Sequence, residues 1–131
     1  MIRVGFAGGG VVSDGHLTSL LSDQRVKVTG VADPNPEIRR KIVSTYGLPV
    51  LDDYRKLLGE SDLLYLCTPN YLHHEMALEA IALGKHVIAE KPLALDAAQA
   101  SQMVQAADRA GVRLFVRSEE RRVGKECRSR W

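Results

Sequence analysis

The sequence lacks the features of a membrane-spanning, secreted or disulfide-bonded protein. None of its 131 residues lie in an apolar run of the length, about 20 residues, that a membrane-spanning helix needs. A strand-like segment starts almost at the first residue, without the basic and apolar regions of a secretory signal. Cys67 and Cys127 stand far apart in unlike surroundings, which argues against a disulfide framework or a zinc site. We therefore expect a cytoplasmic protein with no membrane partner and no bound metal.

A strong charge of one sign is also missing. The net charge is only +2, and the positive excess lies in residues 117–131. The near-neutral remainder lacks the basic surface that nucleic-acid-binding domains carry, so we expect no nucleic-acid partner. The chain has 131 residues and a hydrophobic content of 45%, so it is long enough for one domain with a substantial core and too short for two full domains.

What the sequence does contain is an alternation of strand-like and helix-like segments. Strand patterns lie at 1–7, 26–33, 48–51, 63–67, 86–89 and 112–116, and helical patterns at 11–22, 37–46, 53–58, 71–83 and after Asp96. There is no internal repeat or low-complexity linker. This order predicts an α/β fold, a Rossmann-type doubly wound parallel sheet of about six strands with helices on both faces and the strand order 3-2-1-4-5-6.

A glycine turn follows the first strand, in the stretch VGFAGGGVVS from Val4 to Ser13. Gly8 and Gly10 fit the pattern G-x-G-x-x-(G/A), in which the first glycine makes a tight turn and the second lets the backbone approach a pyrophosphate. The helix that begins near Val11 offers the unpaired N–H groups of its first residues, Val11 and Val12, to a diphosphate. Ser13 replaces the third glycine or alanine, which predicts slightly looser helix packing. The same glycines also fit a plain strand-to-helix turn.

Asp33 ends the second strand roughly 25 residues after Gly8, close to the offset of about 20 at which an acid meets the adenosine ribose in dinucleotide-binding folds. A carboxylate there accepts hydrogen bonds from both ribose hydroxyls of NAD and repels the 2′-phosphate of NADP. The alternative is an ordinary turn aspartate. Arg39 and Arg40 keep NADP possible, because a helix arginine could reach the phosphate from this side.

Two further polar groups follow buried strands. Thr68, Pro69 and Asn70 form a turn at the carboxyl end of a central strand, where open α/β sheets place their ligands. Glu90 and Lys91 end another strand, where they are costly to bury unless they meet a ligand or each other. We therefore regard Glu90 and Lys91 as the best candidates for chemistry.

The remaining candidate side chains have plainer interpretations. Cys67 fits a small core residue, because nothing near it in the sequence is arranged to lower its pKa. His16 is expected on the surface of its helix or in a groove rather than as a ligand. His73 and His74 are adjacent on a helix and point about 100° apart, so they cannot both bind one metal from the same face.

Together these residues resemble one family, the glucose-fructose oxidoreductase, inositol dehydrogenase and rhizopine-catabolism group of NAD(P)-dependent oxidoreductases. The resemblance covers residues 1–116 and is carried by the glycine turn, Asp33, the run Thr68-Pro69-Asn70 with His73, and the strand-end run Glu90-Lys91-Pro92. It implies an oxidoreductase that transfers a hydride between a nicotinamide cofactor, NAD or NADP, and a sugar, cyclitol or related polyol.

The resemblance also implies a role for each residue. The glycine turn would hold the pyrophosphate, and Asp33 the adenosine ribose. On the nicotinamide side, Glu90 would bind the ribose, and Lys91 would bond the substrate hydroxyl and favour its deprotonation as the catalytic residue. The other residues expected to line that side are Thr68, Pro69, Asn70 and His73.

Relatives in this family continue into a second α/β domain that supplies most of the substrate pocket, a histidine acid/base and often the dimer interface. We expect residues 1–116 to be the dinucleotide-binding domain, with no second domain and little or no turnover on its own, and the full-length form to be a homo-oligomer. The run RSEERRVGKECRSRW, residues 117–131, resembles the in-frame translation of a sequencing-library adapter. The alternatives for that run are a disordered basic end or a patch that binds nucleic acid or a membrane surface.

Two other functions compete with the oxidoreductase. One is a dinucleotide-binding module that senses redox state or scaffolds a partner without catalysis, although such a module has less need of Glu90 and Lys91. The other is a methyltransferase, whose glycine loop and ribose acid occupy similar positions, but which the runs Thr68-Pro69-Asn70 and Glu90-Lys91-Pro92 fit poorly.

Overall fold

Strands and helices alternate along the whole of the computed structural model, which describes residues 1–117 and all their side chains except those of Val11 and Val12. The elements in chain order are β1 (Ile2–Ala7), α1 (Val11–Leu21), β2 (Val26–Ala32), α2 (Pro36–Tyr46), β3 (Val50–Leu51), α3 (Arg55–Leu58), β4 (Leu63–Leu66), the 3₁₀ turn η1 (Asn70–Leu72), α4 (His73–Ala82), β5 (His86–Glu90), α5 (Ala97–Ala110) and β6 (Leu114–Arg117).

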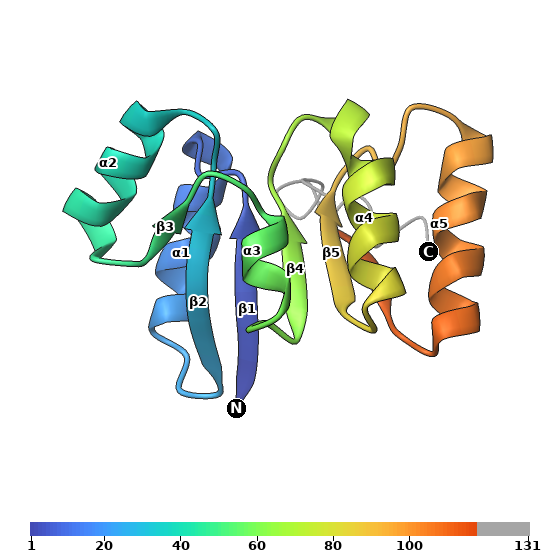
Figure 1. Ribbon diagram of the computed structural model, residues 1–131, viewed down its shortest axis with the longest axis horizontal. Helices are drawn as coiled ribbons and strands as arrows, with labels where there is room; N and C mark the ends of the chain where they lie inside the picture. The colour runs from blue at the N-terminus through green and yellow to red at the C-terminus, as the bar shows by residue number, and fades with distance from the viewer. Residues whose placement is uncertain (118–131) are drawn as a thin grey trace, which may run out of the picture.

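The strands form one parallel sheet in the order β3-β2-β1-β4-β5-β6 (Figure 1). This confirms the predicted order, in which the chain moves outward from β1 in one direction, returns, and continues from β4 in the other. The connections of β1 and β4 therefore leave the sheet on opposite sides, and a crevice opens between their carboxyl ends. This crevice is the position at which such sheets bind ligands.

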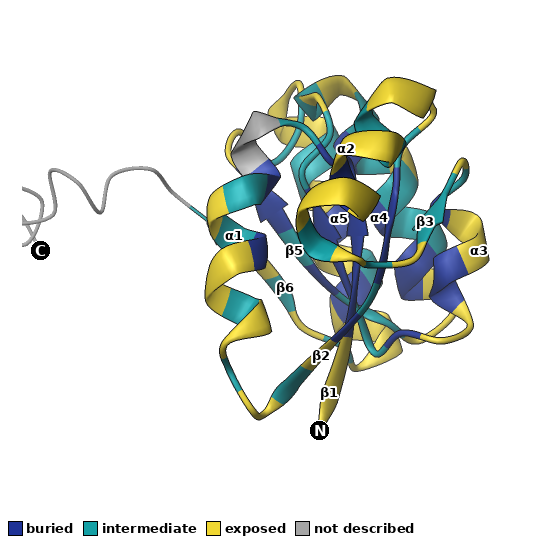
Figure 2. Cartoon of the chain, turned by 90° about the vertical axis from the view of Figure 1, so that its left-hand side faces the viewer, coloured by how far each residue is buried: buried dark blue, intermediate teal, exposed yellow. Residues whose placement is uncertain are grey.

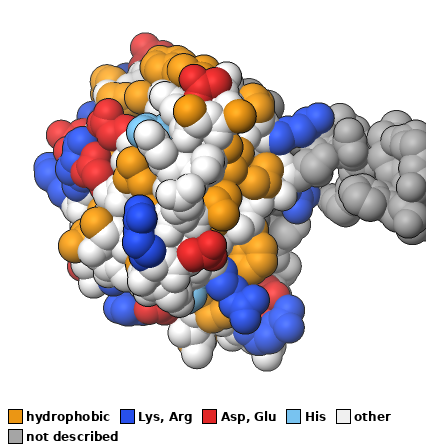
Figure 3. All heavy atoms as spheres, turned by 90° about the vertical axis from the view of Figure 1, so that its right-hand side faces the viewer, with side chains coloured by type: hydrophobic (Ala, Val, Ile, Leu, Met, Phe, Trp, Pro, Cys, Tyr) orange, Lys and Arg blue, Asp and Glu red, His pale blue; other side chains and the backbone are white. Residues whose placement is uncertain are grey.

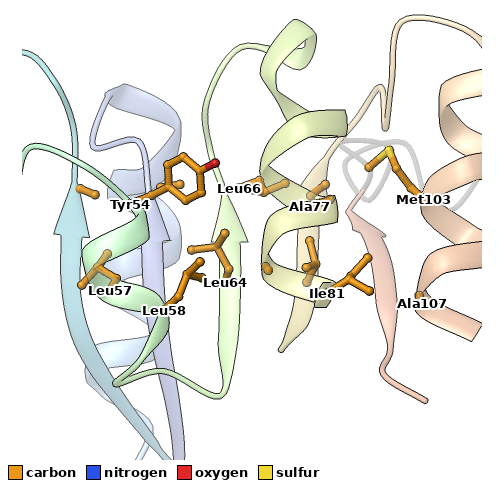
Figure 4. Packing of buried hydrophobic residues seen from close by; sticks show 14 residues of the cluster. Tyr54, Leu57, Leu58, Leu64, Leu66, Ala77, Ile81, Met103 and Ala107 are labelled. Carbon is orange, nitrogen blue, oxygen red and sulfur yellow. The ribbon is translucent and has the colours of Figure 1, made fainter. Parts of the chain in front are cut away.

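Helices cover both faces of the sheet, because the strands are apolar on both sides. Helices α1 and α2 pack on one face around Phe6, Leu17 and Ile42. Helices α3, α4 and α5 pack on the other, where Figure 4 shows Leu64 of β4 next to Leu58 of α3. The carboxyl-terminal halves of β1, β2 and β4 consequently lie in the buried centre of the molecule (Figure 2).

Capping residues set where the longer helices begin and end. Asp96 accepts a hydrogen bond from the backbone N–H of Gln99 at 2.8 Å, which confirms it as the cap of α5. Gly47 and Gly111 end α2 and α5 in the left-handed conformation, with φ of 68° and 70°. The helix expected over 71–83 is wrong at its start, because that segment first makes the 3₁₀ turn η1.

The end of the sheet at β6 carries exposed apolar side chains. Figure 3 shows hydrophobic groups gathered between charged ones on this side, and the exposed residues of α5 and β6 include Val104, Phe115 and Val116. Within residues 1–117, no helix is both long and apolar enough to cross a membrane.

Candidate dinucleotide site

The turn after β1 requires a glycine at its first position. Gly8 has a φ of +98°, and a Cβ added there would lie 2.9 Å from the backbone carbon and oxygen of Cys67. Only glycine adopts this conformation freely and allows so close an approach to the neighbouring chain. Its N–H donates to the carbonyl of Ala32 at 2.7 Å, so the turn bridges the ends of β1, β2 and β4.

The second glycine of the motif faces open space instead. A Cβ added to Gly10 would meet no atom of the described residues within 4 Å. Gly10 is the N-cap residue of α1 and provides no side-chain cap, so the first N–H groups of the helix are available to a ligand. This cradle fits a diphosphate, because helix N-termini attract anions and the missing side chain leaves room for one.

Ser13, at the third position of the motif, is fully buried and packs without leaving its hydroxyl unsatisfied. Its Oγ donates a hydrogen bond to the carbonyl of Gly10 at 2.7 Å. The serine is therefore accommodated on the buried side of α1, and the slightly looser packing expected of it stays a prediction.

Asp33 stands directly beside the glycine turn. One carboxylate oxygen accepts a hydrogen bond from the backbone N–H of Gly9 at 3.0 Å, and the other accepts one from that of Asn35 at 2.9 Å. Arg39 donates to the backbone carbonyl of Asp33 at 2.7 Å rather than to its carboxylate. The carboxylate is thus held in one orientation, and each oxygen keeps a lone pair for a ligand hydroxyl.

A pocket of about 480 Å³ joins these groups. It lies at the carboxyl ends of β1, β2 and β4, in the crevice that the strand order creates. The lining residues are Ala7, Gly8, Gly10, Ala32, Asp33, Pro34, Ile38, Asp52, Asp53, Tyr54, Cys67, Thr68, Pro69, Tyr71, Leu72 and Met76. Gly8, Gly10, Asp33, Thr68 and Pro69, which the sequence singles out, therefore share one cavity.

His73, which is expected to line the nicotinamide side of the site, is a buried residue. It is 1% exposed, with Nε2 at 3.0 Å from the carbonyl oxygen of Thr68. Nδ1 lies at 3.2 Å and 3.3 Å from the carbonyl oxygens of Pro92 and Leu93. The ring therefore ties the turn after β4 to the loop after β5. Its contact with a cofactor stays a prediction.

Glu90 and Lys91 separate at the end of β5. The Glu90 side chain is 11% exposed and meets His16, whose Nε2 lies 2.7 Å from Oε2. Tyr65 Oη lies 3.5 Å and Arg117 Nε 3.7 Å from the same oxygen. Lys91 is exposed, and a cis peptide bond joins it to Pro92. Glu90 is therefore paired with other residues, and Lys91 is free to meet a substrate.

His16 lies in a groove, one of the two positions expected for it, but the sequence did not predict which residues it contacts there. Its side chain is only 12% exposed and stacks on the ring of Tyr65, with centroids 4.9 Å apart. The partners Tyr65, Glu90 and Arg117 are far away in the sequence, so no local pattern reveals them. The only available signal is that His16 lies about one and a half turns into the helix that starts at the glycine turn.

Cys67 behaves as the core residue expected from the sequence. Burial, with a smaller contribution from the Glu90 carboxylate, raises the pKa of its thiol to about 12. At neutral pH the thiol is therefore protonated and a poor nucleophile. Within residues 1–117, no three His, Cys, Asp or Glu side chains are grouped so that they could hold a metal ion.

The sheet order, the glycine cradle and the strand-end acid define a dinucleotide-binding domain of the Rossmann class. Residues 2–118 match the oxidoreductase family with an NAD-binding Rossmann fold. The chain belongs to this family, and it is an NAD-binding domain.

Sugar and cyclitol dehydrogenases are among the relatives of the chain. It is 34% identical to glucose-6-phosphate 3-dehydrogenase of Bacillus subtilis, over 86% of this chain and 32% of that enzyme. Against inositol 2-dehydrogenase/D-chiro-inositol 3-dehydrogenase of Lactiplantibacillus plantarum, the identity is 32% over 86% of this chain and 34% of the enzyme. The chain thus spans about a third of the length of these relatives.

The chain also matches solved structures of dehydrogenases over about a third of their length. The WlbA dehydrogenase of Bordetella pertussis, in complex with NADH and UDP-GlcNAcA, superposes with a TM-score of 0.83 and 34% identity, over 88% of this chain and 36% of that chain. The WlbA dehydrogenase of Chromobacterium violaceum, also in complex with NADH and UDP-GlcNAcA, superposes with a TM-score of 0.86 and 31% identity, over 92% of this chain and 36% of that chain.

The resemblance of residues 117–131 to a translated adapter stays a prediction, because all of these residues except Arg117 lie outside the part of the chain that the structure describes.

Proposed function

We propose that this chain is the coenzyme half of an oxidoreductase that interconverts an alcohol and a carbonyl on a sugar, cyclitol or related polyol, with NAD as the hydride carrier. The observation that carries the proposal is the open space before Gly10 at the start of α1, with Asp33 fixed beside it. Sugar and cyclitol dehydrogenases among the relatives support the substrate class.

Each residue has a task in this proposal. Gly8 shapes the turn, and Gly10 with the N–H groups of Val11 and Val12 binds the diphosphate. Asp33 accepts hydrogen bonds from the adenosine ribose. Toward the nicotinamide, Glu90 binds the second ribose, and the supporting residues are Thr68, Pro69, Asn70 and His73.

Lys91 is the proposed catalytic residue. NAD, when bound, accepts or returns the hydride. Lys91 is exposed at the end of β5, so its ammonium can donate a hydrogen bond to a substrate hydroxyl and, as a cation, stabilise the oxygen as its proton passes to the acid/base histidine of the second domain in the full-length protein. In full-length relatives, Lys91→Ala at this position should abolish turnover and spare NAD binding. A non-catalytic sensor would show no turnover before the substitution either.

Cofactor binding is tested by titrating NADH into the folded chain and following its fluorescence, with NADPH in parallel. We expect saturable binding that favours NADH. Asp33→Asn replaces the carboxylate by an amide that cannot accept from both backbone N–H groups and no longer repels a 2′-phosphate. It should shift the preference toward NADPH by about tenfold, or about 1.4 kcal/mol. An unchanged preference would remove Asp33 from the ribose site.

Gly10→Ala provides the matched control. The new methyl group contacts no described residue, so the fold should be retained, but it occupies the space proposed for the diphosphate. NADH binding should fall at least tenfold. Equal binding by the wild type and this variant would place the diphosphate elsewhere.

We further propose that the full-length protein acts in the cytoplasm as a homo-oligomer, without nucleic-acid partners. The near-neutral charge of the chain outside residues 117–131 supports the absence of a nucleic-acid surface. Light scattering on a full-length relative, with and without added DNA, tests the oligomeric state and the absence of nucleic-acid binding.

A further inference from the structure

His16 and Glu90 lie 74 residues apart in the chain but meet at the end of β5. Helix α1, which carries His16, begins directly after Gly10 of the glycine turn. The two side chains are 12% and 11% exposed, and Nε2 of His16 lies 2.7 Å from Oε2 of Glu90. The helix that starts at the diphosphate cradle therefore also contacts the acid at the opposite end of the proposed cofactor site.

Aromatic stacking holds the imidazole in place. Its ring stacks on Tyr65 with an interplanar angle of 28°, and Tyr65 stacks on Phe6 with centroids 5.0 Å apart and an angle of 7°. This column of rings orients Nε2 toward Glu90. A phenylalanine would stack on Tyr65 equally well, so this stacking does not explain why a ring nitrogen lies at this position.

Nε2 is also incompletely satisfied. It is buried and close to Oε2, but the oxygen lies off the direction of a hydrogen bond, and no other described residue accepts from or donates to this nitrogen. A buried polar atom without an aligned partner costs stability. The nitrogen is therefore better explained by a role in the site than by a role in the fold.

The contacts of Glu90 are concentrated on one oxygen. His16, Tyr65 and Arg117 all approach Oε2, the latter two at 3.5 Å and 3.7 Å, and no hydrogen bond from the described residues reaches Oε1. Cys67 is the other titratable group near this carboxylate, and its thiol is protonated. One oxygen is thus held by the protein, and the other is left for a ligand.

We infer that His16 is a positioning residue: it holds Oε2 of Glu90 so that Oε1 is presented to a hydroxyl of the ribose on the nicotinamide side. This inference rests on the proposed function, because that ribose belongs to NAD. His16 does not itself touch the cofactor. Its effect passes through Glu90 and is confined to ligands that carry the second ribose.

Three ligands separate this role from a structural one. ADP contains the adenosine and diphosphate, ADP-ribose adds the second ribose, and NADH adds the nicotinamide. In the full chain, His16→Phe keeps a ring for stacking on Tyr65 and removes the nitrogen. We expect it to weaken ADP-ribose and NADH roughly tenfold, the size of a lost charge-assisted hydrogen bond, and to leave ADP unchanged.

Glutamine and asparagine at position 16 provide a matched pair of variants. The side-chain nitrogen of glutamine reaches approximately the place of Nε2, whereas that of asparagine reaches only the place of Nδ1. His16→Gln should therefore recover most of the affinity for ADP-ribose, and His16→Asn should not. In a Glu90→Ala background, His16→Phe should have no further effect, because the residue it positions is gone.

The outcomes are distinct. If His16→Phe weakens all three ligands alike, or none of them, His16 is a packing residue and the inference is overturned. Equal affinity of the wild type for ADP and ADP-ribose also overturns it, since the second ribose then has no site. Failure of the folded wild type to bind any of the three overturns the proposed function itself. Should His16→Phe not fold, the pair His16→Gln and His16→Asn decides the same question.

Discussion

Gly8 and Gly10 occupy one turn and are glycines for different reasons. At Gly8 the protein itself excludes a side chain, through a φ of +98° and the backbone of Cys67 2.9 Å from an added Cβ. At Gly10 no described atom does so. The motif therefore combines a requirement of the fold with a requirement of the ligand.

This difference predicts opposite results for two similar substitutions. Gly8→Ala should lower the free energy of unfolding by more than about 1 kcal/mol, because alanine is strained at positive φ and clashes with β4. Gly10→Ala should change it by no more than about 0.5 kcal/mol. Urea denaturation followed by circular dichroism measures both, and an equal loss in the two variants would contradict the distinction.

Cys67 provides a prediction about reactivity. Its pKa is raised to about 12 by burial, so the thiolate is scarce well above neutral pH and only becomes abundant as the pH approaches that value. In a Cys127→Ser variant, where Cys67 is the single thiol, we expect no reaction with an aromatic disulfide reagent at pH 8 within minutes. Full reaction should follow in denaturant. Rapid reaction of the folded protein would show that the pocket wall at Cys67 opens.

At the scale of the elements, the start of α5 is stabilised by the side chain of its N-cap residue, Asp96. The Asp96 carboxylate accepts from the N–H of Gln99, and the Gln99 side chain accepts from the N–H of Leu95 at 3.2 Å. These contacts satisfy N–H groups at the start of the helix that otherwise have no partner.

Asp96→Ala should therefore destabilise the protein by about 1 kcal/mol, whereas Asp96→Ser, which keeps an acceptor, should lose much less. Thermal unfolding of the two variants measures the difference. Asp96 does not line the pocket, so the affinity for NADH should be unchanged in both variants. A loss of affinity in Asp96→Ala would mean that α5 influences the loop of Lys91.

At the scale of the whole molecule, ligand binding and folding are coupled, because the pocket is assembled from β1, β2, β4 and the segments that follow them. NADH at 100 times its dissociation constant should stabilise the folded chain by about 2.7 kcal/mol. We expect the midpoint of thermal unfolding to rise by on the order of 10 °C. At the same NADH concentration the Gly10→Ala variant, which should bind at least tenfold more weakly, should gain no more than about 1.4 kcal/mol and show a correspondingly smaller rise.

Local patterns in the sequence predicted a large part of this molecule. Apolar runs located the strands, and Asp96 marked the start of the last helix, because these features depend on neighbours a few residues away. The strand order was the one expected of a doubly wound sheet with six strands. The glycine turn and Asp33 were found together because a strand-to-helix turn and a strand end have recognisable short motifs.

The contacts between distant side chains were decided only by the tertiary structure. Nothing local indicates that His16 approaches Glu90, or that His73 binds the carbonyls of Thr68 and Pro92 instead of standing open in the cleft. Parallel strands bring together residues that lie far apart in the chain, and only packing decides which face each side chain takes. The sequence by itself thus determined the fold and the glycine turn proposed to bind the diphosphate, whereas the tertiary structure decided how Glu90, at the other end of the proposed site, is held.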